Sequence, residues 1–233
     1  MVKGLVLSSG GVDSTTCVAL AIKDLGIENV ATVSFSYGQR HTKELVCARA
    51  VAGYYDIPHY VINLADTGIY EYSNCALLGG STKEIKHEDY ATQIKEDGIV
   101  NTYVPFRNGL MLSCAAALAS SINADDQTYL YLGAHADDAA GNAYADCSVD
   151  FVKHMEQAIH VGTYGLVQVV APLVDLTKKE VVKSGLELNA PYHLTWSCYE
   201  GGTEPCGKCA TCVDRIKAFE LNGVVDPIMK VEE

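Results

Sequence analysis

Apolar residues in the first third of the chain form two kinds of run. Short continuous runs rich in β-branched residues are typical of buried strands, and longer stretches with apolar residues three or four positions apart are typical of helices that face a core. These patterns predict strands at residues 2–7, 29–35 and 58–64, with helices at 14–25 and 42–55 between them. Because strands and helices alternate over this short length, right-handed crossovers and a parallel sheet are expected.

The alternation is then interrupted and resumes later. Residues 65–102 contain few apolar positions, so we expect no regular structure there; such a long stretch is expected to be a mobile insertion or, as we favour, a lid over the site. Helices are then predicted at 109–122 and 151–161, strands at 128–132 and 167–170, and a further helix that opens with a capping box at 177–180. The sequence assigns no chemistry to that box. The whole pattern predicts an α/β fold with a doubly wound, mainly parallel sheet.

Composition narrows the class of protein. At 233 residues the chain suits one α/β domain, predicted over 1–185, followed by a small C-terminal segment over 186–233. A formal net charge of −12 argues against a large basic surface, so stable binding to nucleic acid is not expected. The sequence has no apolar run near the roughly 20 residues of a membrane span, and its start does not read as a signal peptide. A cytoplasmic protein without membrane attachment is therefore expected.

The segment after the first predicted strand has the residues of an anion-binding loop. Gly10 and Gly11 permit a tight turn with N–H groups directed inward, and Ser14 and Thr15 place hydroxyl groups beside the unpaired amides of the following helix. The loop holds no lysine of the Walker type, so it is not expected to bind a γ-phosphate under attack. The alternative is a strand-to-helix turn that binds no ligand.

Two further segments carry polar side chains suited to a substrate. Arg107 stands at the start of a predicted helix, where its guanidinium could bind a phosphate or carboxylate; the alternative is an arginine that binds a neighbouring carbonyl group. Residues 133–147 follow a predicted strand and contain two glycines, a histidine, three aspartates and an asparagine. This composition suits a substrate and a Mg²⁺ ion, and a solvated acidic loop is the alternative.

The chain carries nine cysteines, an odd number that does not resemble a secreted disulfide framework. Four of them, Cys198, Cys206, Cys209 and Cys212, lie close together with glycines that permit tight loops. This spacing predicts a tetrahedral, structural Zn²⁺ site with no open position. Iron–sulfur ligation uses similar spacings, but here the fourth cysteine lies on the N-terminal side and no Cys-Pro pair follows. The metal is expected to fix a segment with too few apolar residues to fold unaided.

The residues Ser9-Gly10-Gly11-Val12-Asp13-Ser14 resemble the S-G-G-x-D-S loop of the N-type ATP pyrophosphatases. In that family the loop holds the pyrophosphate that leaves, while a nucleophile takes the AMP. The order of this loop, residues 37–41, 104–108 and 133–147 and the cysteine cluster is similar to that of the 7-cyano-7-deazaguanine synthases of the queuosine pathway. Ala145 departs from the family pattern, in which a proline is expected.

This resemblance implies an activity. ATP would adenylate the carboxylate of 7-carboxy-7-deazaguanine, ammonia from solution would give the amide, and a second ATP would activate the amide oxygen so that a nitrile remains. The implied ligands are ATP with Mg²⁺, ammonia and the deazaguanine, and a homodimer is expected. A tRNA-thiolating enzyme with the same loop would require a basic face, which the net charge of −12 disfavours. The sequence also leaves open that the protein is a nucleotide-binding paralogue, stabilised by zinc, that acts on another molecule.

The expected site residues fall into three groups besides the cysteines. The catalytic residues are Asp13, Ser14 and Arg107. The ATP-binding residues are Ser8, Ser9, Gly10, Gly11, Val12, Asp13, Ser14, Thr15, Thr16, Cys17, Val18, Tyr37, Gly38 and Gln39. The substrate-binding residues are Arg107, Asn108, His135, Asp137 and Asp146.

Overall fold

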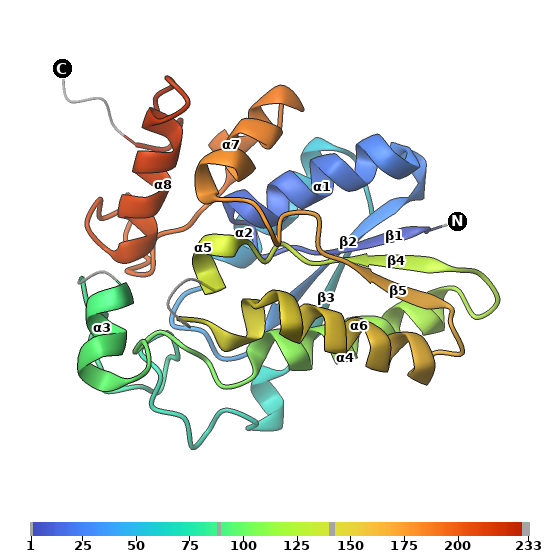
Figure 1. Ribbon diagram of the computed structural model, residues 1–233, viewed down its shortest axis with the longest axis horizontal. Coiled ribbons are helices and arrows are strands. Elements are labelled where there is room, and N and C mark those ends of the chain that lie inside the picture. Colours follow the sequence, from blue (N-terminus) through green and yellow to red (C-terminus); the bar gives the residue numbers. More distant parts are fainter. Residues whose placement is uncertain (1, 88–89, 140–142, 230–233) are drawn as a thin grey trace.

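A parallel sheet forms the centre of the computed structural model, which describes residues 2–87, 90–139 and 143–229. Its five strands have the order β3-β2-β1-β4-β5, and every neighbouring pair is parallel (Figure 1). The strands are β1 (Gly4–Leu7), β2 (Val30–Ser36), β3 (His59–Asn63), β4 (Thr128–Tyr131) and β5 (Val167–Val170). The predicted doubly wound α/β fold is confirmed, because the chain builds the sheet outward from β1 in both directions.

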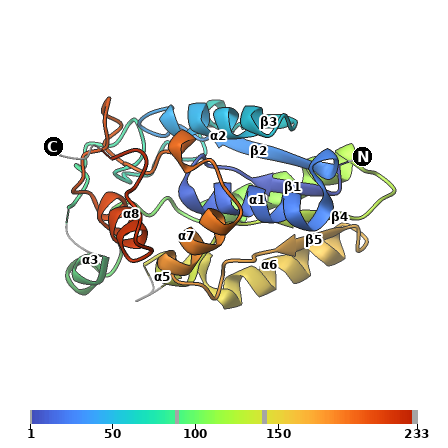
Figure 2. The ribbon, with the colours of Figure 1, turned by 90° about the horizontal axis from the view of Figure 1, so that it is seen from above.

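Helices cover both faces of this sheet (Figures 1 and 2). The helices on one face are α1 (Val12–Leu25), α2 (Lys43–Tyr54) and α7 (Lys178–Glu187), and those on the other are α4 (Arg107–Ile122) and α6 (Val149–Gly162). Since the strand order reverses between β1 and β4, the loops that leave these two strands diverge and open a crevice between them. Among the described residues, no helix is both long and apolar enough to cross a membrane.

Helix α4 begins two residues before the predicted start at 109. The carboxylate Oδ2 of Asp146 accepts a hydrogen bond from the main-chain N–H of Asn108 at 2.9 Å. A residue distant in sequence thus caps one of the main-chain amides that have no partner within the first turn of the helix. The helix buries small residues, Ala115, Ala116 and Ala119, which lets it pack closely against the sheet. The helix predicted at 109–122 is therefore confirmed, with an earlier start.

Residues 65–102 contain more structure than predicted, so the expectation of no regular structure is wrong. They include a short 3₁₀ helix (Ala65–Thr67) and α3 (Tyr90–Asp97). The consecutive residues 75–78 are buried and join the core, where periodicity could not reveal them. The carbonyl oxygen of Leu77 accepts a hydrogen bond from the Arg40 amide at 2.8 Å, and Gly79 donates to the Gly38 oxygen at 2.8 Å. The segment thus supports the loop that follows β2.

The C-terminal segment is fastened by a buried ion pair. Arg215, on α8 (Ala210–Glu220), has none of its surface exposed and binds Asp226 through two hydrogen bonds of 2.7 and 2.9 Å. Its guanidinium also donates to Thr195 Oγ1 at 2.8 Å and to the Tyr192 oxygen at 3.3 Å. Helix α8 packs against α7 (Figure 2). The boundary between 185 and 186 stays a prediction, although buried side chains on both sides of it share one core.

We expect Asp226→Ala to destabilise the fold by about 3–5 kcal/mol, because it leaves the buried Arg215 guanidinium without its anionic partner. In thermal unfolding followed by circular dichroism, the midpoint should fall by roughly 10 °C. Asp125→Ala removes an exposed aspartate and should change stability by less than about 0.5 kcal/mol. Equal midpoints for the two variants would contradict this role of the pair.

Candidate functional site

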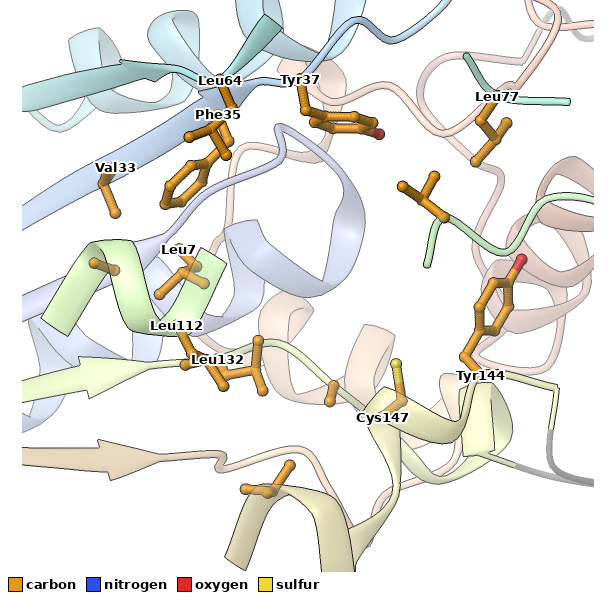
Figure 3. Close-up of a cluster of buried hydrophobic side chains, with 14 of the residues drawn as sticks. Leu7, Val33, Phe35, Tyr37, Leu64, Leu77, Leu112, Leu132, Tyr144 and Cys147 are labelled. Carbon is orange, nitrogen blue, oxygen red and sulfur yellow. The ribbon is translucent and has the colours of Figure 1, made fainter. Parts of the chain in front are cut away.

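A cavity of about 760 Å³ opens at the carboxyl ends of the strands. Its walls come from the loop after β1, the segments after β2 and β4, the first turns of α2, α4 and α7, and the C-terminal segment. The loops after β1 and β2 thus face the same crevice. Apolar side chains contribute part of the lining, among them Leu7, Phe35, Leu132 and Tyr144 (Figure 3). The cavity therefore combines a polar end with an apolar wall that could hold a flat ring.

The loop after β1 has the backbone shape that an anion site requires. Gly10 has φ +77°, and a Cβ there would lie 2.3 Å from the main-chain oxygen of Glu44, so only glycine fits. Gly11 precedes the first residue of α1 and offers no side chain to cap it, which leaves first-turn amides available. The Ser14 hydroxyl lies 3.2 Å from the Ser9 hydroxyl, and both residues line the cavity.

Asp13 lies in a cluster of charged groups at this end of the cavity. Lys178 Nζ is 2.7 and 2.6 Å from its two carboxylate oxygens, and His135 Nε2 is 3.8 Å from Oδ1. His135 Nε2 also lies 3.3 Å from Asp138 Oδ2. Burial raises the pKa of the Asp13 carboxyl, but Lys178 and His135 outweigh it and the net shift is downward. Burial raises the pKa of Asp138 despite the same two neighbours. The charged neighbours therefore favour the ionised form of Asp13 more strongly than that of Asp138.

The predicted capping box brings Lys178 to Asp13. Thr177 and Glu180 form the box at the start of α7, as expected. Asp137 adds a cap from outside the helix, because its Oδ2 accepts a hydrogen bond from the Lys178 main-chain N–H at 2.7 Å. Asp137 also lines the cavity, so its predicted contact with substrate stays a prediction. Because the capping box accounts fully for residues 177–180 as a helix start, sequence reasoning assigned no chemistry to Lys178.

Asn108 and Asp146 bind each other. The Asn108 side-chain amide donates to the Asp146 main-chain oxygen at 3.0 Å, in addition to the cap described above. Asp146 is 4% exposed and does not belong to the cavity lining, whereas Asn108 does. In this structure Asp146 positions α4 and its neighbour Arg107, and its direct contact with substrate stays a prediction.

Arg107 occupies a second charged corner of the cavity. Its Nη1 donates to the Tyr37 hydroxyl at 3.4 Å, and Glu44 from the first turn of α2 lines the same cavity. Burial lowers the pKa of Arg107, but Tyr37 and Glu44 more than compensate, so the net shift is upward and the guanidinium stays charged. Gln39 holds the turn after β2, because its Oε1 accepts from the Tyr37 amide at 2.8 Å. Gly38 has φ +86° in this turn.

Several predicted nucleotide contacts lie away from the cavity. The side chains of Val12, Thr15, Thr16, Cys17 and Val18 are buried in α1, and none belongs to the cavity lining. Burial also raises the pKa of the Cys17 thiol, which disfavours the nucleophilic thiolate form. By contrast, Ser8, Ser9, Gly11, Asp13, Ser14, Tyr37 and Gln39 all line the cavity.

The four predicted metal ligands lie together. The sulfur atoms of Cys198, Cys206, Cys209 and Cys212 are all within 4.8 Å of one another, and those of Cys206 and Cys212 are 4.0 Å apart. Four thiolates around a tetrahedral Zn²⁺ at about 2.3 Å would have sulfurs roughly 3.8 Å apart. The donor set and its spacing therefore fit such a metal.

This cluster adjoins the cavity. The Trp196 indole donates to the Cys198 main-chain oxygen at 2.8 Å, and the Trp196 amide donates to the Gly10 oxygen at 2.9 Å. Trp196, Ser197 and Tyr199 line the cavity. The cysteine cluster thus holds one wall of the site against the loop after β1.

Comparison with known proteins assigns the family. A family model described as "Queuosine biosynthesis protein QueC" matches residues 3–223. The chain belongs to the QueC family. A 7-cyano-7-deazaguanine synthase from Oceanobacillus iheyensis is 40% identical, and the alignment covers 97% of both chains. The protein of the same name from Nitratiruptor sp. is 41% identical over 97% of both chains, and that from Archaeoglobus fulgidus is 38% identical over 99% of this chain and 91% of its own.

Solved structures agree on the fold. The structure of NMN synthetase from Francisella tularensis has a TM-score of 0.52 with this chain at 14% identity, covering 95% of this chain and 77% of the other. At that identity the likeness concerns the fold alone. The resemblance drawn from the loop, the later motifs and the cysteine cluster is confirmed at the level of the family.

Sequence reasoning missed six charged residues that line this QueC-family cavity: Glu44, Asp138, Lys178, Lys179, Asp214 and Lys217. Glu44 and Lys178 stand in the first turns of helices, where charged residues are common for helical reasons alone. Asp138 directly follows Asp137, and the spacing of residues in the sequence could not show which of the two belongs to the site. Only the position of Glu44 shortly after the loop that ends β2 could have pointed to the site.

Proposed function

We propose that this chain is an ATP-dependent ligase that converts 7-carboxy-7-deazaguanine and ammonia into 7-cyano-7-deazaguanine. The observation that carries the proposal is the cavity itself: a lysine-free anion loop at one end and a charged Arg107 corner at the other face one space of about 760 Å³. Cavities of this size accommodate ligands of nucleotide dimensions. The names of the similar proteins from three organisms support the same reaction.

The reaction needs two activations. The substrate carboxylate attacks the α-phosphorus of ATP and pyrophosphate leaves; ammonia then attacks the acyl carbon and AMP leaves, giving the amide. The amide oxygen attacks a second ATP in the same way, and loss of AMP and a proton gives the nitrile. A carboxylate is inert to ammonia until its oxygen becomes part of a leaving group, so an α-phosphorus site suits this chemistry.

The loop after β1 would hold the departing pyrophosphate. Main-chain amides of the first turn of α1 and the hydroxyls of Ser9 and Ser14 would donate to its oxygens. Lys178 would supply the positive charge that a Walker lysine supplies elsewhere, from a helix 165 positions along the chain from Asp13. Asp13 and Asp138 are the carboxylates best placed to hold the Mg²⁺ that accompanies ATP, and the ion would neutralise phosphate charge.

The four-cysteine cluster would hold a structural Zn²⁺. Four thiolates leave no coordination position open for a substrate, so its contribution would be to fix residues 196–199 beside the loop after β1. A tRNA thiolase would instead need a reactive cysteine in the cavity. Cys147 is the cysteine among the described cavity residues, and burial raises the pKa of its thiol well above the usual range.

The first expected outcome concerns the products of ATP. Purified protein incubated with ATP, Mg²⁺, ammonium and 7-carboxy-7-deazaguanine should release AMP and pyrophosphate, with two AMP for each nitrile detected by mass spectrometry. A reaction without the deazaguanine should release little of either. Formation of ADP and phosphate alone would show that the loop after β1 has been misassigned.

Lys178→Met should lower kcat by about 10²–10³-fold, because it removes charge that stabilises the departing pyrophosphate. Asp13→Asn should also lower turnover. Lys183→Met, in the same helix but exposed and 3.9 Å from Glu187, is the matched control and should keep wild-type kinetics. Pyrophosphate release gives the rates, and circular dichroism checks that α7 is intact. Wild-type turnover in Lys178→Met would remove this lysine from the mechanism.

Elemental analysis should find one zinc per chain. Cys209→Ala should lose the metal, become sensitive to protease near the C-terminus and lose activity, since metal binding supplies on the order of 10 kcal/mol to the folding of small sites. Cys114→Ala changes a cysteine outside the cluster and should keep the zinc. Iron in protein purified without oxygen, or a stable and active Cys209→Ala without metal, would contradict the proposal.

A further inference from the structure

The Glu44 carboxylate lines the cavity without a partner of its own. Within the described part of the chain it accepts no hydrogen bond and forms no salt bridge. It lies in the first turn of α2, and Gly10 passes so close to the backbone of this helix that a side chain on Gly10 would collide with it. A carboxylate can accept several hydrogen bonds, and one left without donors on a cavity wall can bind a ligand that brings them.

Glu44 belongs to the corner that contains Arg107. Both residues line the large cavity and also a small side pocket of about 30 Å³, together with Tyr37 and Tyr199. Burial raises the pKa of Glu44 more than Arg107 lowers it. Arg107 thus shares this corner of the cavity with Glu44 and with Tyr37, to which it donates a hydrogen bond.

The edges of purine-like rings differ in how they match a carboxylate. A guanine-type ring presents two adjacent donors, N1–H and the 2-amino group, which two carboxylate oxygens can accept together. An adenine-type ring presents one donor beside one acceptor, and the acceptor would face a carboxylate oxygen unfavourably. A carboxylate without donors therefore favours the guanine-type edge.

The other edge of the proposed substrate carries acceptors. The 6-oxo group and the 7-carboxylate lie next to each other, and a guanidinium can donate to both. A ring held at its N1–H and 2-amino edge by Glu44 would direct this acceptor edge toward Arg107. The 7-carboxylate would then lie against Arg107, in the same cavity as the loop after β1, where the α-phosphorus is expected.

We propose that Glu44 is the specificity-determining residue of the site, accepting hydrogen bonds from N1–H and the 2-amino group of the deazaguanine while Arg107 binds its 6-oxo and 7-carboxylate groups. The inference rests on the proposed function, since it assigns the substrate of that site to one corner of the cavity. It divides the cavity into a base corner at Glu44 and a phosphate end at Asp13 and Lys178.

Comparing two ligands with the wild-type protein and with variants of Glu44 and of a control residue tests this assignment. Isothermal titration calorimetry would measure the binding of 7-carboxy-7-deazaguanine and of 7-carboxy-7-deazahypoxanthine, which lacks the 2-amino group. The wild-type protein should bind the first about 10- to 100-fold more tightly. Glu44→Gln should reduce this preference to less than about threefold, because its amide replaces an acceptor by a donor. Glu71→Gln, at an exposed position, should keep the full preference.

Binding of ATP and the thermal midpoint, measured on the same proteins, exclude a folding defect, and neither should change in Glu44→Gln. If the wild-type protein binds neither purine, both the proposed function and this inference fail. If the wild-type protein prefers the 2-amino compound and Glu44→Gln keeps that preference, the inference alone is overturned. Weaker ATP binding in Glu44→Gln with an unchanged purine preference would also overturn it, by placing Glu44 beside the nucleotide.

Discussion

The ion pair between Lys178 and Asp13 joins the two parts of the molecule on which the site depends. It connects the start of α7 to the first turn of α1 across 165 positions of sequence, with Nζ 2.6 and 2.7 Å from the carboxylate oxygens. The Lys178 and Asp13 side chains are only 17% and 24% exposed, so the pair is better shielded from solvent than an ordinary surface ion pair. It keeps a positive charge beside the anion loop before any phosphate arrives, so little reorganisation is needed when one binds.

A protein with a net charge of −12 must concentrate positive charge locally to bind anions. The fold does so at the carboxyl ends of the strands, where Arg107 starts α4 and Lys178 starts α7. Each is held from outside its helix by an aspartate that caps a main-chain amide, Asp146 for α4 and Asp137 for α7. The acidic residues after β4 thus position the basic ones, in addition to any contact with ligand.

Local patterns predicted the parts of the structure that depend on local physics. The strands, the turn at Gly10 and the four-cysteine spacing follow from propensity, backbone freedom and donor type, which neighbouring residues reveal. Residues 75–78 were missed because their burial depends on packing against a distant loop. Lys178 and Glu44 were missed for the same reason, since a charged residue in a first helical turn looks the same whether it faces solvent or a cavity. Their assignment required the topology that brings helix starts to one edge of the sheet.

The C-terminal segment forms part of the wall of the cavity. A hydrogen bond from the Trp196 amide ties that segment to the Gly10 oxygen at the point where the loop after β1 turns, and Lys43 Nζ lies 3.9 Å from the centre of the Trp196 ring. The indole in turn donates to Cys198, the first residue of the cysteine cluster. A metal held by the cluster would therefore restrain Trp196, and Trp196 would restrain the anion loop. In the proposed mechanism, a metal site without open coordination positions would still affect catalysis, because it would reduce the freedom of the loop proposed to hold pyrophosphate.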